Sequence, residues 1–429
     1  MMLHALFVAA ALSAQDTLSP PARRILDDIR YLAADAREGR GIGTEGLADA
    51  ARYLADAFRR AGLKPAFAGG AYTQPFTISA DAAAAMHSNV AGQATENVAG
   101  VLPGTSPRLR GQVVVVGAHY DHLGFGGFGA LDPDSNGVVH NGADDNASGA
   151  AALLEIARRL SALRPARTIV FVAFSGEELG LLGSSYYVSH PALQPVDSIY
   201  AMLNLDMVGR LRNGKLMALG ALTAQEFGPL LDSLNRVEPP ASAGPAGRTA
   251  YRFDLRASGD GWGPSDHASF YAVKRPVLQF FTDLHADYHR STDDWDKINA
   301  SGTARVAEFV ADLAWALANR PGPLTFVDVP RPQVAAGGSG YGPYLGTIPD
   351  MTESPGGVRL NGVRTGSPAE KAGLARGDII TGFGDHAVAN LMDMTLALRE
   401  HQAGDTVSIT VKRGEETLRL QAVLAKRGS

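Results

Sequence analysis

The chain has 429 residues, of which 45% are hydrophobic and 19% are charged, a composition typical of a globular protein long enough for two domains. Its net charge of −5 provides no basic field for binding nucleic acid or an anionic membrane. The absence of cysteine excludes disulfides, thiolate metal sites and a cysteine nucleophile. Any metal ion would therefore have to be bound by His, Asp and Glu side chains.

Residues 1–14 have the pattern of a signal peptide. An apolar run over 3–12 is followed by the small residues Ser13 and Ala14, although no Lys or Arg precedes it. The run is too short to cross a bilayer, and no other stretch predicts a transmembrane segment. We therefore expect an exported protein, periplasmic or extracellular; the alternative is a partly buried N-terminal helix.

Residues 15–320 alternate between helical and strand patterns. Helices are predicted over 22–32, 47–61, 147–163 and 178–189. Buried strands are predicted over 111–119, 168–174, 198–205 and 276–281, which are continuous apolar runs. This alternation predicts an α/β domain with a mainly parallel central sheet flanked by helices.

The composition changes near residue 320. Residues 321–341 are rich in Pro and Gly and predict a linker. In the remaining 342–429, the stretch SPAEKAGLARGD resembles the PDZ domains of bacterial envelope proteases, which are small and β-rich. The resemblance implies that Tyr344-Leu345-Gly346 holds the carboxylate of a peptide or protein C-terminus, that the peptide adds as a strand beside 346–348, and that a helix at 390–401 forms the opposite wall. The alternative is a closed structural cap that binds nothing.

Polar side chains gather where the predicted strands of the larger domain end. His119 and Asp121 follow the first strand, Glu177 and Glu178 the second, and Asp206 the third. Ligand sites in open α/β sheets form at the carboxyl ends of the strands. Residues two apart in an extended chain face the same way, so Asp121 can orient the ring of His119.

Two further segments supply ligand types for a metal site. GADDNASG at 142–149 is a turn that opens a helix, and DYHRSTDDWDKIN carries His289. Two His and three carboxylates suit two zinc ions, and with a bridging hydroxide the charges would cancel. Taken singly, these residues are more often loop histidines, helix N-caps and solvated acid pairs. Their order at successive strand ends favours a shared site.

The motifs AHYDH, GADDNASG, SGEELGLLGS, LNLDMVG, SDHASF and DYHRSTDDWDKIN, together with EGRGIGTEGLADAARYLADAFRRAGLKPA, resemble the di-zinc aminopeptidase family, metallopeptidase family twenty-eight, over about residues 18–319. The resemblance implies two zinc ions per chain. One would be bound by His119, Asp145 and Asp206, and the other by Asp145, Glu178 and His289.

The same resemblance implies catalytic roles. Glu177 would be the general base and acid, Asp121 would orient His119, and Tyr288 would polarise the scissile carbonyl. Ser265 and Asp266 would contact the ligand residues and help to hold them in place. Asp145 is chosen over its neighbour Asp144 because many members carry an acid only at the second position.

The predicted function is zinc-dependent removal of N-terminal residues from peptides, by attack of a metal-bridging hydroxide. The alternatives are a dipeptidase, carboxypeptidase or cyclase of the same fold, or a non-catalytic PDZ scaffold that binds peptides. Phe253, Trp262, Phe270 and Tyr271 either line the substrate pocket or belong to the core.

Two other motifs are weaker. Residues 124–129 fit G-x-G-x-x-G, but no helix pattern follows them, so they predict a loop beside the cleft rather than a dinucleotide site. Residues 132–137 imitate the start of an EF-hand, but Ala143 stands where the bidentate Glu belongs.

Overall fold

The computed structural model describes residues 18–79, 90–127, 129–132, 135–193, 195–236, 251–329, 343–349, 356–388, 393–394, 397–398 and 401–425. The predicted leader at 1–14, most of the linker predicted at 321–341 and most of the helix predicted at 390–401 lie outside these residues. Among the described helices, none combines the length and the apolar character that crossing a membrane requires.

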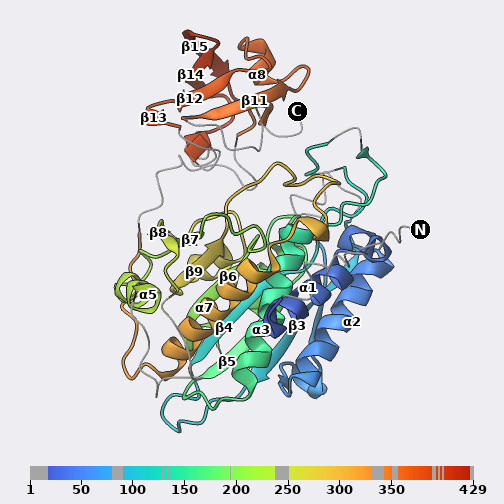
Figure 1. The fold of residues 1–429 in the computed structure, drawn as a ribbon, viewed down its shortest axis with the longest axis vertical. Helices are drawn as coiled ribbons and strands as arrows, with labels where there is room; N and C mark the ends of the chain where they lie inside the picture. Colours follow the sequence, from blue (N-terminus) through green and yellow to red (C-terminus); the bar gives the residue numbers. More distant parts are fainter. Residues whose placement is uncertain are drawn as a thin grey trace, which may run out of the picture.

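A mixed sheet forms the centre of the larger domain (Figure 1). Its middle strands, in spatial order, are β5 (Thr168–Phe174), β4 (Val113–His119), β6 (Ile199–Leu205) and β9 (Val277–Phe281), and neighbours in this order are parallel. Every residue of these four strands is buried, as expected of apolar strands covered on both faces. The predicted α/β sheet is therefore confirmed.

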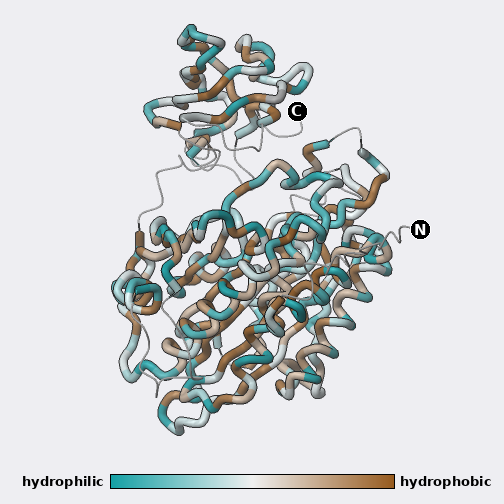
Figure 2. Tube along the Cα trace, viewed as in Figure 1, coloured by the Kyte–Doolittle hydropathy of each residue, from teal (hydrophilic) through white to brown (hydrophobic). Residues whose placement is uncertain are grey.

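Helices cover both faces of this sheet. One face carries α1 (Pro20–Leu32), α2 (Glu45–Arg60), α3 (Gly149–Ser161) and α7 (Ala300–Asn319), and the other carries α4 (Leu182–Ser189) and α6 (His267–Ala272). Alternate residues of β4 serve the two cores: Val114 and Val116 pack with the first group, and Val113 and Val115 with the second. The colouring in Figure 2 shows hydrophobic residues concentrated along the central strands.

The flanks of the sheet are partly antiparallel and were not predicted. β3 (Ala94–Leu102) runs antiparallel to β5, and β7 (Lys215–Leu219) runs antiparallel to β9 and parallel to β8 (Asp254–Ser258). The remaining elements at this periphery are β1 (Lys64–Pro65), β2 (Thr73–Thr77) and α5 (Phe227–Arg236). Because β7 and β8 are short and partly exposed, they lack the continuous apolar run that marks the central strands.

Two helices begin later than the sequence predicts. The helix expected from residue 178 begins only at Leu182, because Gly180 and Leu181 have φ angles of 107° and 61° and turn the chain instead. The helix expected from residue 147 begins at Gly149, after an irregular turn at 143–148 in which Asp145 and Asn146 have non-helical backbone angles. Glu178 therefore stands in a loop with Glu177, and Asp145 stands in the turn before α3.

The C-terminal domain has its own hydrophobic core and its own antiparallel sheet. Its elements are β10 (Thr347–Pro349), β11 (Val358–Val363), α8 (Pro368–Lys371), β12 (Ile379–Phe383), β13 (His386–Ala387), β14 (Thr406–Arg413) and β15 (Glu416–Val423). Buried Asp378 accepts hydrogen bonds of 2.7 and 2.8 Å from Arg413, which ties the turn before β12 to the end of β14. This architecture confirms the predicted β-rich second domain.

Candidate active site

The five predicted metal ligands meet at the carboxyl end of the parallel strands. His119 is the last residue of β4, and Asp206 directly follows β6. Glu178 lies in the loop after β5, and His289 lies in the loop after β9. Asp145 comes from the turn that precedes α3. Parallel pairing of the strands thus brings residues far apart in the sequence to one edge of the sheet.

The side chain of Asp145 lies between the two histidines. Its Oδ1 is 3.3 Å from Nε2 of His119, and its Oδ2 is 3.1 Å from Nε2 of His289. Each histidine has a second carboxylate at similar range: Asp206 Oδ1 is 3.5 Å from His119 Nε2, and Glu178 Oε2 is 3.1 Å from His289 Nε2. The arrangement is two half-sites that share one carboxylate, with Asp145 as the bridge.

The neighbouring carboxylate, Asp144, points elsewhere. Its Oδ1 accepts a 2.6 Å hydrogen bond from the backbone N–H of Gly209, and its Oδ2 is 3.1 Å from Nε2 of His285. Asp293 accepts hydrogen bonds from the backbone N–H groups of both Asp144 and Asp145, at 2.8 and 3.1 Å. Asp293 therefore fixes the turn, and of the two neighbouring carboxylates Asp145 faces His119 and His289, whereas Asp144 faces His285.

Both histidines are oriented by backbone carbonyls on the side away from the carboxylates. His119 Nδ1 is 3.2 Å from the carbonyl oxygen of Asp121, and His289 Nδ1 is 3.0 Å from that of Gly129. A proton on Nδ1 donates to these carbonyls and leaves Nε2 of each ring free to bind a cation. The glycine-rich loop at 124–129, predicted to lie beside the cleft, thus contacts a predicted ligand directly.

The carboxylate of Asp121 has a different principal contact from the one expected. Its oxygen is 3.7 Å from His119 Nδ1, whereas it accepts backbone hydrogen bonds from Glu177 (3.1 Å) and Glu178 (3.4 Å). Asp121 therefore fixes the loop that carries the two glutamates, and its predicted influence on His119 stays a prediction.

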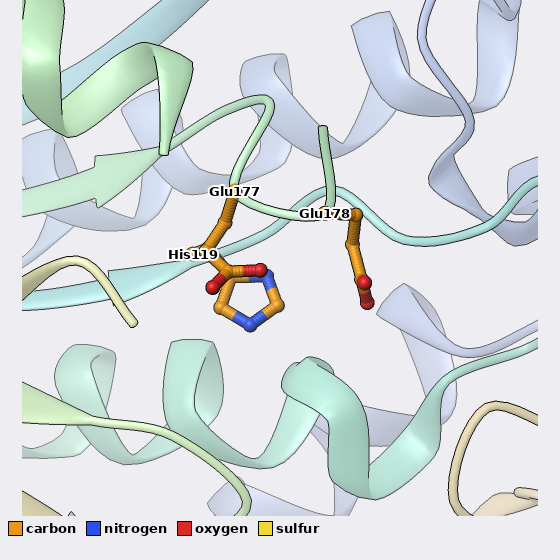
Figure 3. A group of neighbouring side chains, drawn as sticks. All are labelled: His119, Glu177 and Glu178. Atoms are coloured by element: carbon orange, nitrogen blue, oxygen red, sulfur yellow. The ribbon is translucent and has the colours of Figure 1, made fainter. Parts of the chain in front are cut away.

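Glu177 lies beside the two half-sites, and its carboxylate forms a further group with His119 and Glu178 whose ligand atoms lie within 4.8 Å of one another. Figure 3 shows Glu177 and Glu178 leaving adjacent positions of one loop, with the carboxylate of Glu177 beside the ring of His119. Burial raises the pKa of Glu177 well above its ordinary value, and the charge of Glu178 adds to this effect. A buried carboxylate whose proton affinity is raised is suited to accept and return a proton.

The electrostatics of the cluster favour positive charge at its centre. Burial acts to lower the pKa of His119 and His289, but the surrounding carboxylates outweigh burial and raise both pKa values well above the ordinary value. Burial likewise acts to raise the pKa of Glu178, but His289 and His122 bring it down to about 2. A site that stabilises cationic histidines in this way is also suited to bind a metal cation.

Tyr288 packs against the loop-held histidine. Its ring stacks on that of His289, with centroids 3.9 Å apart and 25° between the planes. Burial raises the pKa of its phenol well above the ordinary value, and the charges of Asp145 and Glu178 reinforce the shift. Tyr288 therefore keeps its O–H as a hydrogen-bond donor beside the site.

Buried Arg40, for which no role was predicted, joins the end of α1 to two loops of the site. Arg40 donates four hydrogen bonds of 2.7–2.8 Å to the carbonyl oxygens of Leu32, Tyr120, Asn141 and Gly142. Burial lowers its pKa to about 10, so the guanidinium remains charged.

The glycine before Arg40 shows how closely this segment packs. Gly39 has φ 56°, and a Cβ there would overlap the carbonyl oxygens of Gly124 and His140. Residues 38–41, with the sequence EGRG, therefore pack closely against the loops of the site. The two glycines on either side of Arg40 are the sequence signal that could have indicated its packed position.

The other residues predicted from the sequence either stabilise the site or belong to the hydrophobic core. Ser265 accepts a 2.8 Å hydrogen bond from Asn204, and buried Asp266 has its pKa raised to about 7, chiefly by burial. Phe270 and Tyr271 belong to the core under the sheet, and Phe253 is 5% exposed in the other core. Trp262 is half-buried and packs edge-on against Tyr271. The core interpretation therefore holds for Phe253, Phe270 and Tyr271, whereas Trp262 packs at the edge of the core.

The segment resembling an EF-hand has a structural contact instead of a calcium-site pattern. Asp132 accepts hydrogen bonds of 2.8 and 2.7 Å from the backbone N–H and the hydroxyl of Ser291, and its other oxygen is 2.8 Å from Nε2 of His140. These contacts, here called the Asp132 latch, join the loop before residue 140 to the loop that carries His289.

The donor set fits zinc. Nε2 of His119 is buried without a hydrogen-bond partner, and it faces the oxygens of Asp145 and Asp206. His119, Asp145 and Asp206 also form one of the groups whose ligand atoms lie within 4.8 Å of one another. Nitrogen and oxygen ligands about 2.0–2.2 Å from a tetrahedral zinc lie about 3.3–3.5 Å apart, close to the separations seen here.

Residues 97–314, more than half of the chain, match the model of peptidase family M28. The chain belongs to this family. Residues 343–424 match the PDZ domain. The buried clusters of His, Asp and Glu in the larger domain are in keeping with membership of this peptidase family.

Relatives of this M28 peptidase carry related names. The chain is 41% identical over 97 residues to aminopeptidase YwaD of Bacillus subtilis, a match covering 23% of the chain and 18% of that protein. It is 30% identical over 261 residues to a "probable zinc metalloprotease" of Pyricularia oryzae, covering 52% of the chain and 50% of that protein. The chain thus spans half or less of the length of these relatives.

Solved structures show the same fold. The aminopeptidase from Aneurinibacillus sp. strain AM-1 superposes with a TM-score of 0.51 at 20% identity, covering 72% of this chain and 96% of that one. At this identity the likeness establishes the fold of the larger domain, in agreement with the zinc exopeptidase fold expected from the sequence.

Proposed function

We propose that this M28 peptidase is a two-zinc aminopeptidase that removes N-terminal residues from peptides. The observation that carries the proposal is the position of Asp145, whose two oxygens each face a different histidine. A carboxylate placed in this way suits a pair of ions about 3.5–4 Å apart.

The residues would divide the ions as follows. His119 and Asp206 would hold one zinc, His289 and Glu178 the other, and Asp145 would contribute to both. Bound zinc supplies Lewis acidity, which polarises a carbonyl and makes water easier to deprotonate. The three ligand carboxylates carry three negative charges, so two zinc ions would leave one positive charge to attract an anionic reacting group.

Glu177 would move the proton. Its carboxylate would take a proton from the attacking water and pass it to the nitrogen of the leaving amine, so that one side chain acts first as base and then as acid. The Asp121 carboxylate, by accepting from the backbone N–H groups of Glu177 and Glu178, would keep both glutamates in place during this exchange.

Tyr288 would act on the scissile carbonyl. Its O–H stays protonated next to the ligands, so it can donate a hydrogen bond to the carbonyl oxygen as negative charge develops there. Stacking on His289 limits the positions the ring can take.

The experiment that tests the activity is a substrate panel with purified, zinc-loaded protein. Aminoacyl substrates and peptides with a free N-terminus but a blocked C-terminus should be cleaved, with release of single N-terminal residues detected by mass spectrometry. Release of dipeptides or of C-terminal residues, or cyclisation of an N-terminal residue, would instead favour the dipeptidase, carboxypeptidase or cyclase alternatives. Protein that binds peptides without cleaving any member of the panel would favour the non-catalytic scaffold.

We further propose that the PDZ domain binds the C-terminus of a peptide or protein. β10 lies at one end of the strand order, and its pairing within the described residues is with β11 alone. Gly346, with φ 85°, precedes this strand, and the partial exposure of Thr347 and Ile348 would let a peptide add alongside. Fluorescence anisotropy with labelled peptides should show binding that is lost when the peptide C-terminus is amidated; equal binding of amidated peptides would contradict this mode.

Export is proposed on the apolar run at 3–12 alone. Protein isolated from the native host should begin near Gln15, as measured by N-terminal mass spectrometry. Cytoplasmic protein that retains Met1 would contradict export.

A further inference from the structure

A third histidine, His122, lies within the site. Its ring and the carboxylates of Asp145 and Glu178 form another group whose ligand atoms lie within 4.8 Å of one another, and its Nε2 is buried without a hydrogen-bond partner. His122 follows β4 by three residues, and its side chain is fully buried. Its Nδ1 is 2.8 Å from Oε1 of Glu178. The other oxygen of Glu178, Oε2, is the one that faces His289. The two oxygens of this carboxylate therefore have different partners.

The contact between His122 and Glu178 is shorter than the contacts between the predicted ligands. Two ligands of one tetrahedral zinc lie about 3.3 Å apart, because each is about 2.0–2.1 Å from the ion. The four contacts between the predicted ligands are 3.1–3.5 Å, as expected for side chains that share ions. At 2.8 Å, the contact between His122 and Glu178 has the usual length of an N–H···O⁻ hydrogen bond.

The ring of His122 is held in place from several sides. Its backbone N–H donates a 3.1 Å hydrogen bond to the carbonyl of Arg40. Its edge meets the ring of His289, with centroids 5.8 Å apart and 75° between the planes. At Gly142, a Cβ would overlap the ring of His122, so glycine leaves the space that the ring occupies. The imidazole has little freedom to turn toward another partner.

We propose that His122 is a positioning residue for the zinc held by His289 and Glu178. The Nδ1–H group holds Oε1 of Glu178, so that Glu178 presents the single oxygen Oε2 to the ion. This ordering of the carboxylate raises the zinc affinity of the half-site formed by His289, Glu178 and Asp145, and with it the fraction of protein that carries both ions. The inference rests on the two-ion site proposed above.

Three variants test the role. His122→Phe keeps an aromatic ring and removes the donor, whereas His122→Asn returns an N–H group near the position of Nδ1. His190→Phe, at an exposed site, is the matched control. Zinc dissociation constants are measured by competition with a chromophoric chelator, and Co²⁺ absorption spectra report the ligand environment without any assay of activity. Circular dichroism confirms that each variant is folded.

In His122→Phe, the dissociation constant of the zinc held by His289 and Glu178 should rise about 10- to 100-fold, as is typical when the outer partner of a ligand is removed. The constant of the zinc held by His119 and Asp206 should stay unchanged. His122→Asn should recover most of this loss, and His190→Phe should match the wild type. Unchanged zinc constants in folded His122→Phe would overturn the proposal. Loss of the second ion even at saturating zinc, without rescue by Asn, would also overturn it and make His122 a ligand.

The wild-type stoichiometry separates this inference from the proposed function. One zinc per chain at saturation would refute the two-ion site by itself. The ratio between variant and wild-type constants tests His122 independently.

Discussion

The two halves of the candidate zinc site are built in different ways. His119 and Asp206 stand at or directly after the ends of β4 and β6, which are neighbouring, fully buried strands. Glu178 and His289 stand in loops, and His289 has a positive φ of 54°. One half is thus placed by the hydrogen-bond ladder of the sheet, and the other by contacts between loops.

The two half-sites therefore have the same types of ligand but are held in place by different kinds of structure. The loop-held half depends on Asp121 holding the Glu178 loop, on the carbonyl of Gly129 holding His289, and on the Asp132 latch. Loops open locally at lower free energy than central strands do. We therefore expect the strand-held ion to bind more tightly and the loop-held ion to exchange first.

The largest expected loss of activity comes from a variant that leaves both halves of the zinc site intact. Glu177→Gln keeps the size of the side chain and removes its basicity, so kcat should fall by at least ~10²–10⁴-fold with less change in KM. Zinc content by elemental analysis should stay that of the wild type. Substantial remaining activity with full zinc would show that Glu177 is not the base, and loss of zinc would make it a ligand.

The next prediction tests the comparison directly. Asp206→Asn should weaken the tighter zinc constant, and Glu178→Gln the weaker one, each by at least the ~10–100-fold typical of removing an outer partner. Excess zinc should restore part of the activity of Glu178→Gln. Chelator competition on both variants measures the constants. The comparison fails if each variant shifts both constants equally, or if the two assignments are reversed.

A smaller effect is expected from the Asp132 latch. Asp132→Asn removes one charged acceptor from Ser291 and His140, so the weaker zinc constant should rise about 2- to 10-fold while the tighter one stays unchanged. Asp197→Asn, whose side chain is 85% exposed, is the control. A shift in the tighter constant would mean that the latch supports the whole site.

The pH dependence of the latch has a defined sign. Burial acts to raise the pKa of Asp132, but the hydrogen bonds from Ser291 and His140 outweigh it and lower the pKa to about 2. A carboxylate whose folded pKa is depressed stabilises the folded state above its unfolded pKa of ~3.9, and this stabilisation is lost as pH falls through the folded value. Protonation of Asp132 should therefore contribute nothing to zinc release between pH 5 and 7.

The smallest effect is expected from removing the second domain. All the proposed ligands precede residue 320, so deletion of 342–429 should leave kcat/KM for small aminoacyl substrates within about twofold of the wild type, as expected when no transition-state contact is lost. Steady-state kinetics on the folded, truncated protein measure this. A large loss would mean that the PDZ domain completes the active site and that the predicted domain boundary has no functional meaning.

Sequence patterns predict the strand-held half more easily than the rest. A continuous apolar run ends where a central strand ends, so His119 and Asp206 can be placed by position alone. Glu178 was expected at the start of a helix, but the backbone of Gly180 and Leu181 delays the helix, and periodicity does not report single left-handed residues. His289 could be identified only through the family motif, because a loop has no regular periodicity from which the direction of a side chain can be predicted.

The residues that escaped prediction act through contacts between distant segments. His122 lies in a motif already noticed, yet its partner Glu178 is 56 residues away. Arg40 is 80 residues from Tyr120 and about 100 from Asn141 and Gly142, and its bonds go to backbone carbonyls, which carry no sequence signal of their own. The flanking strands β7 and β8 escaped because the burial of β7 alternates and most of β8 is exposed.

The four hydrogen bonds of Arg40 bear on where the smallest autonomously folding unit of the enzyme begins. Residues 97–314 carry every proposed ligand, yet Arg40 lies upstream of them. A fragment trimmed to those residues would leave the carbonyls of Tyr120, Asn141 and Gly142 without their donor, at a cost of ~1–3 kcal/mol for each one that stays buried and unsatisfied. The segment that carries Arg40 is thus a structural support for the loops that hold the predicted zinc ligands.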